Sequence, residues 1–236
     1  MVCLSDFRVG KLLGAGSFGE VHFARDAAGV DVVLKSMVIV GVSRKEQEAA
    51  LNEVRLLAQL DHPRIVRYHA SFVESERLRI VMQFCECGDL RKHIEAQQDI
   101  APFSAEVAWR FIAQAAQGLA HLHAHKILHR DLKSSNLFLT RKAVGGDSPP
   151  DLVIGDLGCS RLLGATSDLA ATMIGTPYYL SPELCNNELY DAKSDVWALG
   201  VVCYELLTCG EYPYTANNSA ALIMRILRGG YLAPPS

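Results

Sequence analysis

A short segment near the middle of the chain gathers side chains suited to proton transfer and to the handling of phosphate charge. Residues 129–136 read His-Arg-Asp-Leu-Lys-Ser-Ser-Asn. The Asp131 carboxylate can accept or orient the proton of an attacking hydroxyl, and the Lys133 ammonium can neutralise charge on a transferred phosphoryl group. Asn136 can hold a magnesium ion beside them. The alternative is an ordinary polar loop after a helix, but the match to every fixed position of H-R-D-L-x-x-x-N argues against it.

A second carboxylate follows in the segment Ile-Gly-Asp-Leu-Gly at residues 154–158. Asp156 stands at the end of a predicted strand and is followed closely by a glycine. Magnesium prefers one or two carboxylates together with phosphate oxygens and water. We therefore expect Asp156 to be the second metal ligand, alongside Asn136.

A glycine-rich segment near the N-terminus has the pattern G-x-G-x-x-G-x-V, in the order Gly14, Ala15, Gly16, Ser17, Phe18, Gly19, Glu20, Val21. Glycines let the backbone approach phosphate oxygens, to which the amides can donate. The pattern alone also fits a glycine-rich hairpin turn, or a dinucleotide-binding fold if a helix follows it. Because an alternating, strand-like run continues to Ala24, we expect the segment to join two strands.

A lysine at the end of an apolar strand offers a phosphate contact. Lys35 follows Val-Val-Leu, and such a lysine is usually an edge residue whose ammonium reaches water. Glu53 changes this interpretation, because it falls on the next predicted helix. A carboxylate there can pair with Lys35 and hold its ammonium against nucleotide phosphates.

These side chains must be positioned by two kinds of element. Short β-rich runs dominate up to residue 84, and one amphipathic helix covers residues 50–58. The predicted strands are Phe7–Leu13, Val21–Arg25, Val30–Lys35 and Leu78–Met82. Beyond Gly88 we expect long helices over Ala105–His123, with Ser104 as N-cap, and over Ala192–Leu207. The sequence thus predicts an α+β protein with a small β-rich lobe, a larger helical lobe and a joint near residues 84–88.

Composition limits the classes of function. The chain has 236 residues, 50% of them hydrophobic, which suffices for one core or two modest lobes. A net charge of −3 argues against a nucleic-acid partner. The longest apolar runs, residues 37–42 and 196–203, are too short to span a membrane. Seven scattered cysteines without a signal-peptide pattern predict free thiols and a soluble, cytoplasmic protein.

These segments, in this order, resemble the eukaryotic protein kinase superfamily. A further one, Gly-Thr-Pro-Tyr-Tyr-Leu-Ser-Pro-Glu at residues 175–183, resembles its A-P-E anchor with Ser181 in place of alanine. Within the superfamily the chain is most similar to the NIMA-related (Nek) serine/threonine kinases. That similarity rests on the segments at residues 129–139 and 175–183, on Leu-Asn-Glu-Val-Arg-Leu-Leu at 51–57, and on Val-Met-Gln-Phe-Cys-Glu-Cys-Gly-Asp-Leu at 81–90.

The resemblance implies a two-lobed kinase domain over residues 7–236, with an N-lobe at 7–84 and a C-lobe at 85–236. It implies transfer of the γ-phosphoryl group of ATP, with Mg²⁺, to serine or threonine hydroxyls of protein substrates. Catalytic roles fall to Asp131, Lys133, Lys35 and Glu53, and metal binding to Asn136 and Asp156. ATP binding falls to Leu13, Gly14, Ala15, Gly16, Ser17, Phe18, Gly19, Val21, Val33, Lys35, Met82, Gln83 and Cys85.

The sequence departs from the family pattern at several places. Val33 replaces an alanine expected to face the adenine, and Leu157 replaces the phenylalanine of D-F-G. Residues 143–151 look like a loop insertion. The chain ends at Ser236, soon after a predicted helix at 220–228, so we expect a C-lobe truncated at its C-terminus and marginally stable. In it Glu183, a buried carboxylate by resemblance, would lack its arginine partner.

Other interpretations remain open. Thr172 matches the Nek activation-loop position, whose phosphate Arg130 would bind, or it is an ordinary loop residue. A scaffold without catalysis would be favoured by degraded catalytic residues, and none is degraded. Metal binding by the clustered histidines, or by the lone pair of cysteines at 85 and 87, is the weakest alternative. The histidines are His121, His123, His125 and His129. The resemblance also implies an association with centrosomes or cilia. No oligomeric state is predicted.

Overall fold

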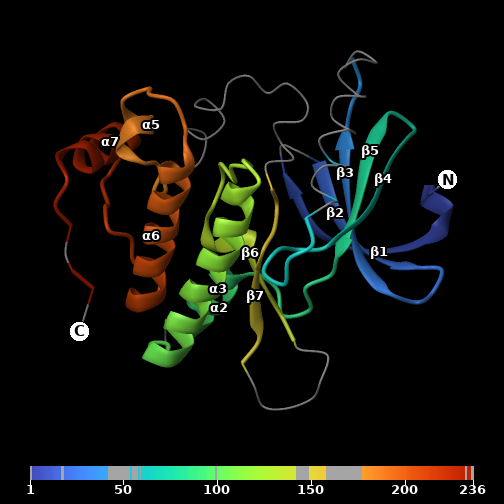
Figure 1. The fold of residues 1–236 in the computed structure, drawn as a ribbon, viewed down its shortest axis with the longest axis horizontal. Coiled ribbons are helices and arrows are strands. Elements are labelled where there is room, and N and C mark those ends of the chain that lie inside the picture. Colours follow the sequence, from blue (N-terminus) through green and yellow to red (C-terminus); the bar gives the residue numbers. More distant parts are fainter. Residues whose placement is uncertain are drawn as a thin grey trace. The chain divides into compact units, whose positions relative to one another are not determined.

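Two units of the chain are described separately in this computed structural model. It describes residues 2–16, 19–41, 54, 58, 60–98, 100–141, 149–157, 177–231 and 233–234. The first unit contains the described residues up to Phe84, and the second contains those from Cys85 onward. The first is built around a β-sheet and the second mainly from helices (Figure 1).

Five antiparallel strands form the sheet of the first unit, in the order β1-β2-β3-β5-β4 (Figure 1). They are β1 Phe7–Gly16, β2 Gly19–Asp26, β3 Asp31–Val38, β4 Tyr68–Glu74 and β5 Arg77–Gln83. The four predicted strands are confirmed, each longer than expected. The fifth, β4, was not predicted. Its turn into β5 places Ser75 and Glu76 at φ values of 52° and 57°, a left-handed pair that normally calls for glycine or asparagine.

One buried apolar cluster of this unit lies on a single face of the sheet. Its buried members come from four neighbouring strands, and Leu4, Phe7 and Ala70 pack against them. They are Ala24, Val32, Leu34, Phe72 and Val81. Most of the predicted helix at residues 50–58 lies outside the described residues. Within it Val54 is buried, and its carbonyl accepts the N–H of Ala58 at 3.0 Å, which is the helical spacing.

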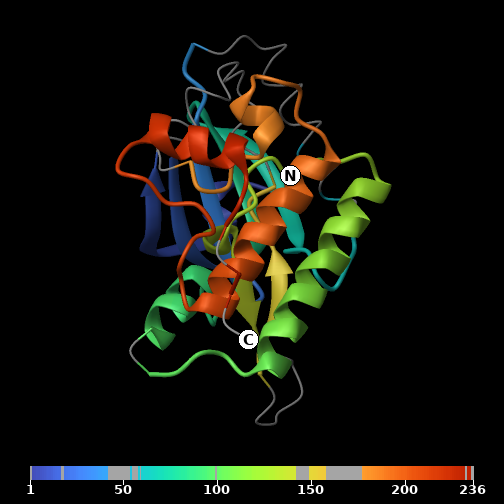
Figure 2. The same ribbon diagram turned by 90° about the vertical axis from the view of Figure 1, so that its left-hand side faces the viewer.

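The second unit consists mainly of helices, together with a two-stranded sheet. The helices are α2 Leu90–Gln97, α3 Ala105–Ala124, α5 Pro182–Cys185, α6 Ala192–Thr208 and α7 Ser219–Arg228. The strands are β6 Leu137–Thr140 and β7 Asp151–Ile154. Helices α3 and α6 lie side by side (Figure 2). Among the helices described, none combines the length and the apolar character that crossing a membrane requires.

Side-chain caps determine where these helices begin. The Ser104 hydroxyl accepts the N–H of Val107 at 3.3 Å, which confirms the predicted N-cap of α3. Asp89 caps α2 in the same way by accepting the N–H of Lys92 at 3.0 Å. Helix α2 was not predicted, because eight residues are too few to display a clear helical period. Asp191 caps α6, which confirms the long second helix.

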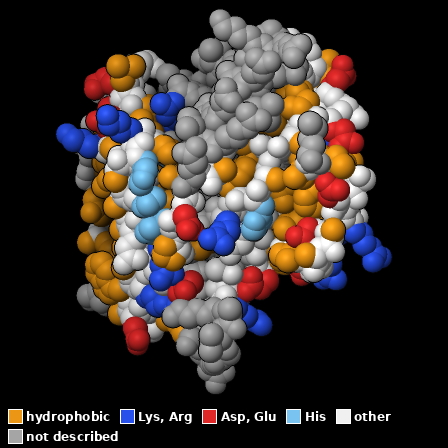
Figure 3. All heavy atoms as spheres, turned by 45° about the vertical axis from the view of Figure 1, so that its right-hand side comes forward, with side chains coloured by type: hydrophobic (Ala, Val, Ile, Leu, Met, Phe, Trp, Pro, Cys, Tyr) orange, Lys and Arg blue, Asp and Glu red, His pale blue; other side chains and the backbone are white. Residues whose placement is uncertain are grey.

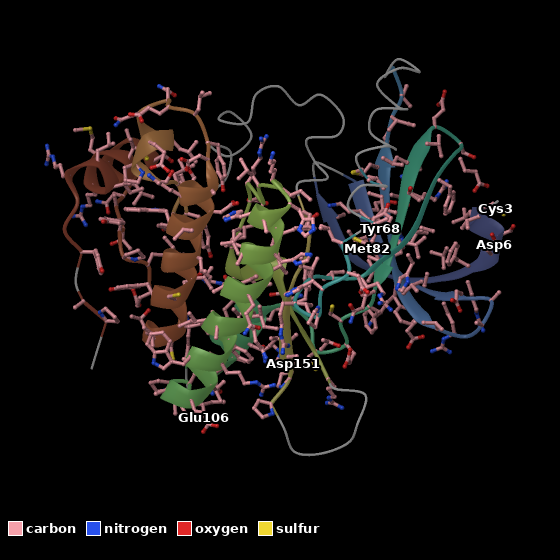
Figure 4. The ribbon with its side chains drawn as sticks, in the orientation of Figure 1. Cys3, Asp6, Tyr68, Met82, Glu106 and Asp151 are labelled. Carbon is pink, nitrogen blue, oxygen red and sulfur yellow. The ribbon has the colours of Figure 1, made fainter. Side chains whose placement is uncertain are left out.

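One end of the expected loop insertion is a strand. Residues 142–148 lie outside the described residues, but Asp151 begins β7 and pairs with Thr140 of β6, so its assignment to the loop was wrong. Its carboxylate accepts bonds from Arg110 at 2.6 Å and Gln114 at 2.8 Å, both on α3. The Gln114 amide oxygen accepts the N–H of Leu152 at 2.7 Å. Figure 4 labels Asp151 where β7 runs beside α3, and these contacts fix the strand there.

Candidate active site

The residues predicted for proton transfer lie together in the second unit. The ammonium of Lys133 lies 2.8 Å and 3.1 Å from the two carboxylate oxygens of Asp131. The Asn136 amide nitrogen donates to the Asp131 carboxylate at 3.0 Å and to its carbonyl at 2.8 Å. The Asp131 side chain remains 49% exposed, so a substrate hydroxyl can reach it. Lys133 and Asn136 follow Asp131 by two and five residues. Their side chains reach its carboxylate because a 3-10 turn over Ser134–Asn136 folds the chain back onto Asp131.

The two predicted metal ligands are brought together by the register of the small sheet. Leu137 of β6 pairs with Ile154 of β7. One step beyond this pair, the carbonyl of Asn136 accepts the N–H of Gly155 at 3.0 Å, and Asp156 follows directly. The Asn136 amide nitrogen faces Asp131, so its amide oxygen is the atom able to face a cation. An amide oxygen and a carboxylate are ligands that magnesium accepts, so these residues fit that ion.

The buried ring of His129 connects the segment that contains Asp131 to the segment that contains Gly155 and Asp156. It is fully buried, and its Nε2 lies 3.0 Å from the carbonyl oxygen of Gly155. Because a carbonyl can only accept, Nε2 carries the proton. Nδ1 then accepts the N–H of Asp131 at 3.3 Å. The neutral imidazole satisfies both partners, and burial lowers its pKa.

The metal hypothesis for the histidines finds no support in the described residues. The His123 ring contacts Asp195 and the His125 ring contacts the carbonyl of His121. No group of three or more His, Cys, Asp or Glu side chains in the described part of the chain could hold a metal ion.

The catalytic segment is anchored by Asp195 of α6, which the sequence analysis did not single out. Its carboxylate accepts the backbone N–H groups of His129 and Arg130, both at 2.9 Å. It also accepts from His123 at 2.7 Å and from the hydroxyl of Tyr190. Asp195 is fully buried. The available signal was a carboxylate directly before the apolar run at residues 196–203 of a predicted helix, because a buried charge requires converging donors.

The glycine-rich segment joins two strands, as predicted. Gly14 pairs with Val21, Ala15 with Glu20, and Gly16 with Gly19 across β1 and β2. Gly19 has a φ of 120°, and a Cβ there would lie 2.0 Å from the Ser36 carbonyl oxygen. Packing therefore demands this glycine. Ser17 and Phe18 lie outside the described residues, whereas Leu13 is exposed on β1.

Lys35 lies on the central strand β3, between Val21 of β2 and Ile80 of β5. Only 7% of it is exposed, so the alternative of a snorkelling edge residue was wrong. Its expected partner Glu53 lies outside the described residues. A buried ammonium must be paired or hydrogen-bonded, and Lys35 has such interactions.

The predicted adenine-facing residues occupy neighbouring strands of the same unit. Val33 of β3 pairs with Met82 of β5, and Met82 also pairs with Tyr68 of β4 (Figure 4). The N–H of Gln83 donates to the Arg67 carbonyl at 2.8 Å. Cys85, the first residue of the second unit, is buried. Burial and the nearby Glu86 raise the pKa of its thiol to about 12.

Glu183 differs from its predicted state. It is partly exposed, and its carboxylate accepts the hydroxyl of Ser194 at 2.5 Å. Burial alone would raise its pKa, but the bonds from Ser194 and from the backbone outweigh that effect and lower it. The expectation that Glu183 is buried was therefore wrong, and the bond from Ser194 was not predicted. Thr172 lies outside the described residues.

Comparison with known proteins agrees with this geometry. Residues 7–232 match the protein kinase domain family. The chain is 41% identical to the serine/threonine-protein kinase Nek5 of Mus musculus over 96% of its own length and 34% of that protein. It is 43% identical to Nek1 of Mus musculus, over 94% of this chain and 18% of that protein. A probable kinase nek3 of Dictyostelium discoideum is 40% identical, over 96% of this chain and 20% of that protein.

The match of the family over nearly the whole chain settles its class. The chain belongs to the protein kinase family, as a serine/threonine kinase domain of the NIMA-related type. Its β-rich first unit and helical second unit are the α+β architecture expected of that family. The chain spans about a third or less of the length of these three relatives.

Proposed function

We propose that the protein containing this chain transfers the γ-phosphoryl group of Mg²⁺-bound ATP to serine and threonine hydroxyls of other proteins. The observation that carries this proposal is the convergence of Asp131, Lys133 and Asn136 on one turn. The bond between Asn136 and Gly155 adds Asp156 to the same site. In phosphoryl transfer the protein itself performs little covalent chemistry. These side chains would therefore act by positioning the reactants and by stabilising the charge of the transferred group.

Asp131 orients the substrate hydroxyl and accepts its proton as the oxygen attacks phosphorus. Lys133 holds the carboxylate in place before the substrate arrives, at 2.8 Å, and lies where it can neutralise the equatorial oxygens of the phosphoryl group. Asn136 and Asp156 would hold magnesium, which would supply positive charge to offset that of the phosphate oxygens. Asn136 has a second task, because its amide N–H keeps the Asp131 carboxylate turned toward the substrate.

The residues of the first unit would bind the nucleotide. The backbone of residues 14–19 would lie over the phosphates, and Lys35, paired with Glu53, would contact two of them. Val33 and Met82 would line the adenine pocket, and backbone groups between Gln83 and Cys85 would bond the adenine edge. The side chain of Cys85 takes no part in this, since it is buried as a neutral thiol.

We propose that the substrates are proteins and not nucleic acids. Acidic and basic side chains are interspersed on the face drawn in Figure 3, and the net charge is −3. A nucleic-acid site requires a basic surface. A cytoplasmic location is a proposal from the family alone.

The test measures transfer of radiolabelled phosphate from ATP to casein by the wild type and by Asp131→Asn. We expect kcat to fall by roughly 10²–10⁴-fold, with the Kd for ATP unchanged within a factor of two. The control is Asp191→Asn, which makes the same change at an exposed helix cap where asparagine is equally suitable. An Asp131→Asn enzyme that keeps more than a tenth of the wild-type rate would refute the role. A wild type without transfer would support the alternative of a non-catalytic scaffold.

A further inference from the structure

Glu205 is a buried carboxylate that the mechanism above does not use. It lies on α6 and is fully buried. Its Oε1 accepts the guanidinium of Arg91 at 2.8 Å and the hydroxyl of Ser134 at 3.2 Å. Its Oε2 accepts the hydroxyl of Tyr179 at 2.6 Å. A carboxylate in such surroundings is stable only when donors converge on it, and here three do.

The three donors come from three different parts of the chain. Arg91 lies on α2, and Tyr179 lies in the segment that precedes α5. Ser134 is the residue between Lys133 and the rest of the 3-10 turn that ends at Asn136. Glu205 therefore connects the turn that carries the catalytic side chains to two segments remote from it in sequence.

The hydroxyl groups of this cluster also contact each other, with 3.1 Å between the Ser134 and Tyr179 oxygens. Tyr179 directs its only hydroxyl proton to Glu205, and the Ser134 hydroxyl can donate to Glu205 or to the Tyr179 oxygen. The Tyr179 oxygen is then left to accept the backbone N–H of Ser134, at 3.5 Å. Tyr179 and Glu205 thus hold both the side chain and the backbone of Ser134. The turn loses an anchor if either residue is changed.

Arg91 is itself held from several sides. Its guanidinium donates to the Tyr212 hydroxyl at 2.8 Å and to Glu95 at 2.7 Å, and it lies 5.6 Å from the centre of the Tyr212 ring. The Tyr212 ring stacks on Tyr178 with 3.9 Å between ring centres. The segment containing Tyr178 and Tyr179 is therefore attached twice, once through ring stacking and once through Glu205.

We propose that Glu205 and Tyr179 are positioning residues for the phosphoryl transfer assigned above, acting through Ser134. They set the orientation of the 3-10 turn, and thus the position of Lys133 on one side of Ser134 and Asn136 on the other. The Asn136 N–H donates to the Lys133 carbonyl at 2.9 Å, so a shift of the turn moves both together. The consequence is that the site is assembled only when the segment at residues 177–181 is in place. This inference rests on the proposed function.

Two variants isolate the effect with little change of shape. Tyr179→Phe removes only a hydroxyl. Glu205→Gln keeps the shape but turns an N–H₂ group toward donors that need an acceptor. We expect each to lower kcat by roughly 10–100-fold, because misplacement of a catalytic group by about 1 Å has an effect of that size. The KM for ATP should stay within a factor of two. The double variant should be no slower than the slower single variant, since both act through one contact.

A matched control separates positioning from stability. Ser104→Ala removes the N-cap of α3 and should lower the melting temperature without changing kcat. All rates are measured well below each melting temperature. Hydrogen exchange provides a second readout: amides of residues 129–137 should exchange faster in Tyr179→Phe, while those of α3 should not.

The outcomes are distinct. If Tyr179→Phe and Glu205→Gln lower the melting temperature as Ser104→Ala does but keep kcat within a factor of two, the positioning role is wrong. Multiplicative effects in the double variant would also overturn it, because they would mean separate roles. A wild type that transfers no phosphate would overturn the proposed function instead. Hydrogen exchange at residues 129–137 would then still decide whether Tyr179 holds the turn.

Discussion

The buried carboxylate of Asp195 accepts the backbone N–H of Arg130 at 2.9 Å, although the two residues are 65 positions apart. Arg130 has a φ of 68°, in the left-handed region that side chains other than glycine and asparagine rarely adopt. Such a conformation persists only where the surroundings hold it. The bond to Asp195 is therefore what keeps the backbone bent directly before Asp131.

Replacing this anchor tests its importance. Asp195→Asn offers one acceptor in place of two and turns an amide N–H₂ toward N–H donors. We expect the free energy of unfolding to fall by roughly 2–5 kcal/mol, and kcat to fall with it because Asp131 is displaced. Urea unfolding and steady-state kinetics measure the two effects. Asp191→Asn, four residues earlier at the helix cap, should change neither. A stable, fully active Asp195→Asn protein would show that Arg130 holds its own conformation.

The glycine-rich hairpin offers a matched pair of substitutions. Gly19→Ala places a Cβ 2.0 Å from the backbone carbonyl of Ser36 at a φ of 120°. We expect it to lower the free energy of unfolding by at least ~1–3 kcal/mol. Gly14→Ala meets no described atom within 4 Å, so it should leave stability unchanged within ~1 kcal/mol. A weaker affinity of Gly14→Ala for ATP, measured by calorimetry, would then report close approach of a phosphate. Equal stability losses in both variants would contradict this reasoning.

The buried His129 predicts a specific dependence of stability on pH. Burial lowers its pKa below the ordinary 6.5, so the unfolded chain binds the proton first. Its contribution to stability is complete above pH 6.5 and is lost as pH falls from there toward the lowered pKa. The slope reaches at most about 1.4 kcal/mol per pH unit.

Urea unfolding of the wild type and of His129→Phe at several pH values isolates this contribution. His69 also has a lowered pKa, and Glu205 has a raised one, but both are common to the two proteins and cancel in the difference. We expect the gap in stability to narrow below pH 6.5. A gap independent of pH would mean that the pKa of His129 is the same in the folded and the unfolded chain, and would contradict the lowering of that pKa by burial.

Cys85 should resist alkylation. Burial, together with Glu86, raises the pKa of its thiol to about 12, and only the thiolate reacts. At pH 8 we expect iodoacetamide to modify it on the order of 10³-fold more slowly in the native protein than in urea. Mass spectrometry of the peptide that also contains the partly exposed Cys87 gives an internal comparison. Similar native and denatured rates at Cys85 would show that its burial is transient.

Features encoded by neighbouring residues could be predicted from the sequence. The Ser104 cap, the hairpin around residues 14–21 and the long helices at 105–124 and 192–208 each depend on local spacing and local hydrogen bonds. The turn that joins Asp131 to Asn136 is equally local, which is why their roles could be predicted before their geometry was known. Strand β4 could not be predicted in this way. Its hairpin turn uses two residues in the left-handed region, Ser75 and Glu76, where the sequence has no glycine to indicate a turn.

The contacts that hold the site depend on tertiary structure. Which polar groups meet Asp195 and Glu205 is decided by how α6 packs, since their donors are distant in sequence. The same is true of Lys35, which is buried only because β3 acquires β5 as a neighbour on its second side. A sequence specifies local geometry through short-range sterics and hydrogen bonds. A buried charge becomes stable only after the folded chain has brought its donors together.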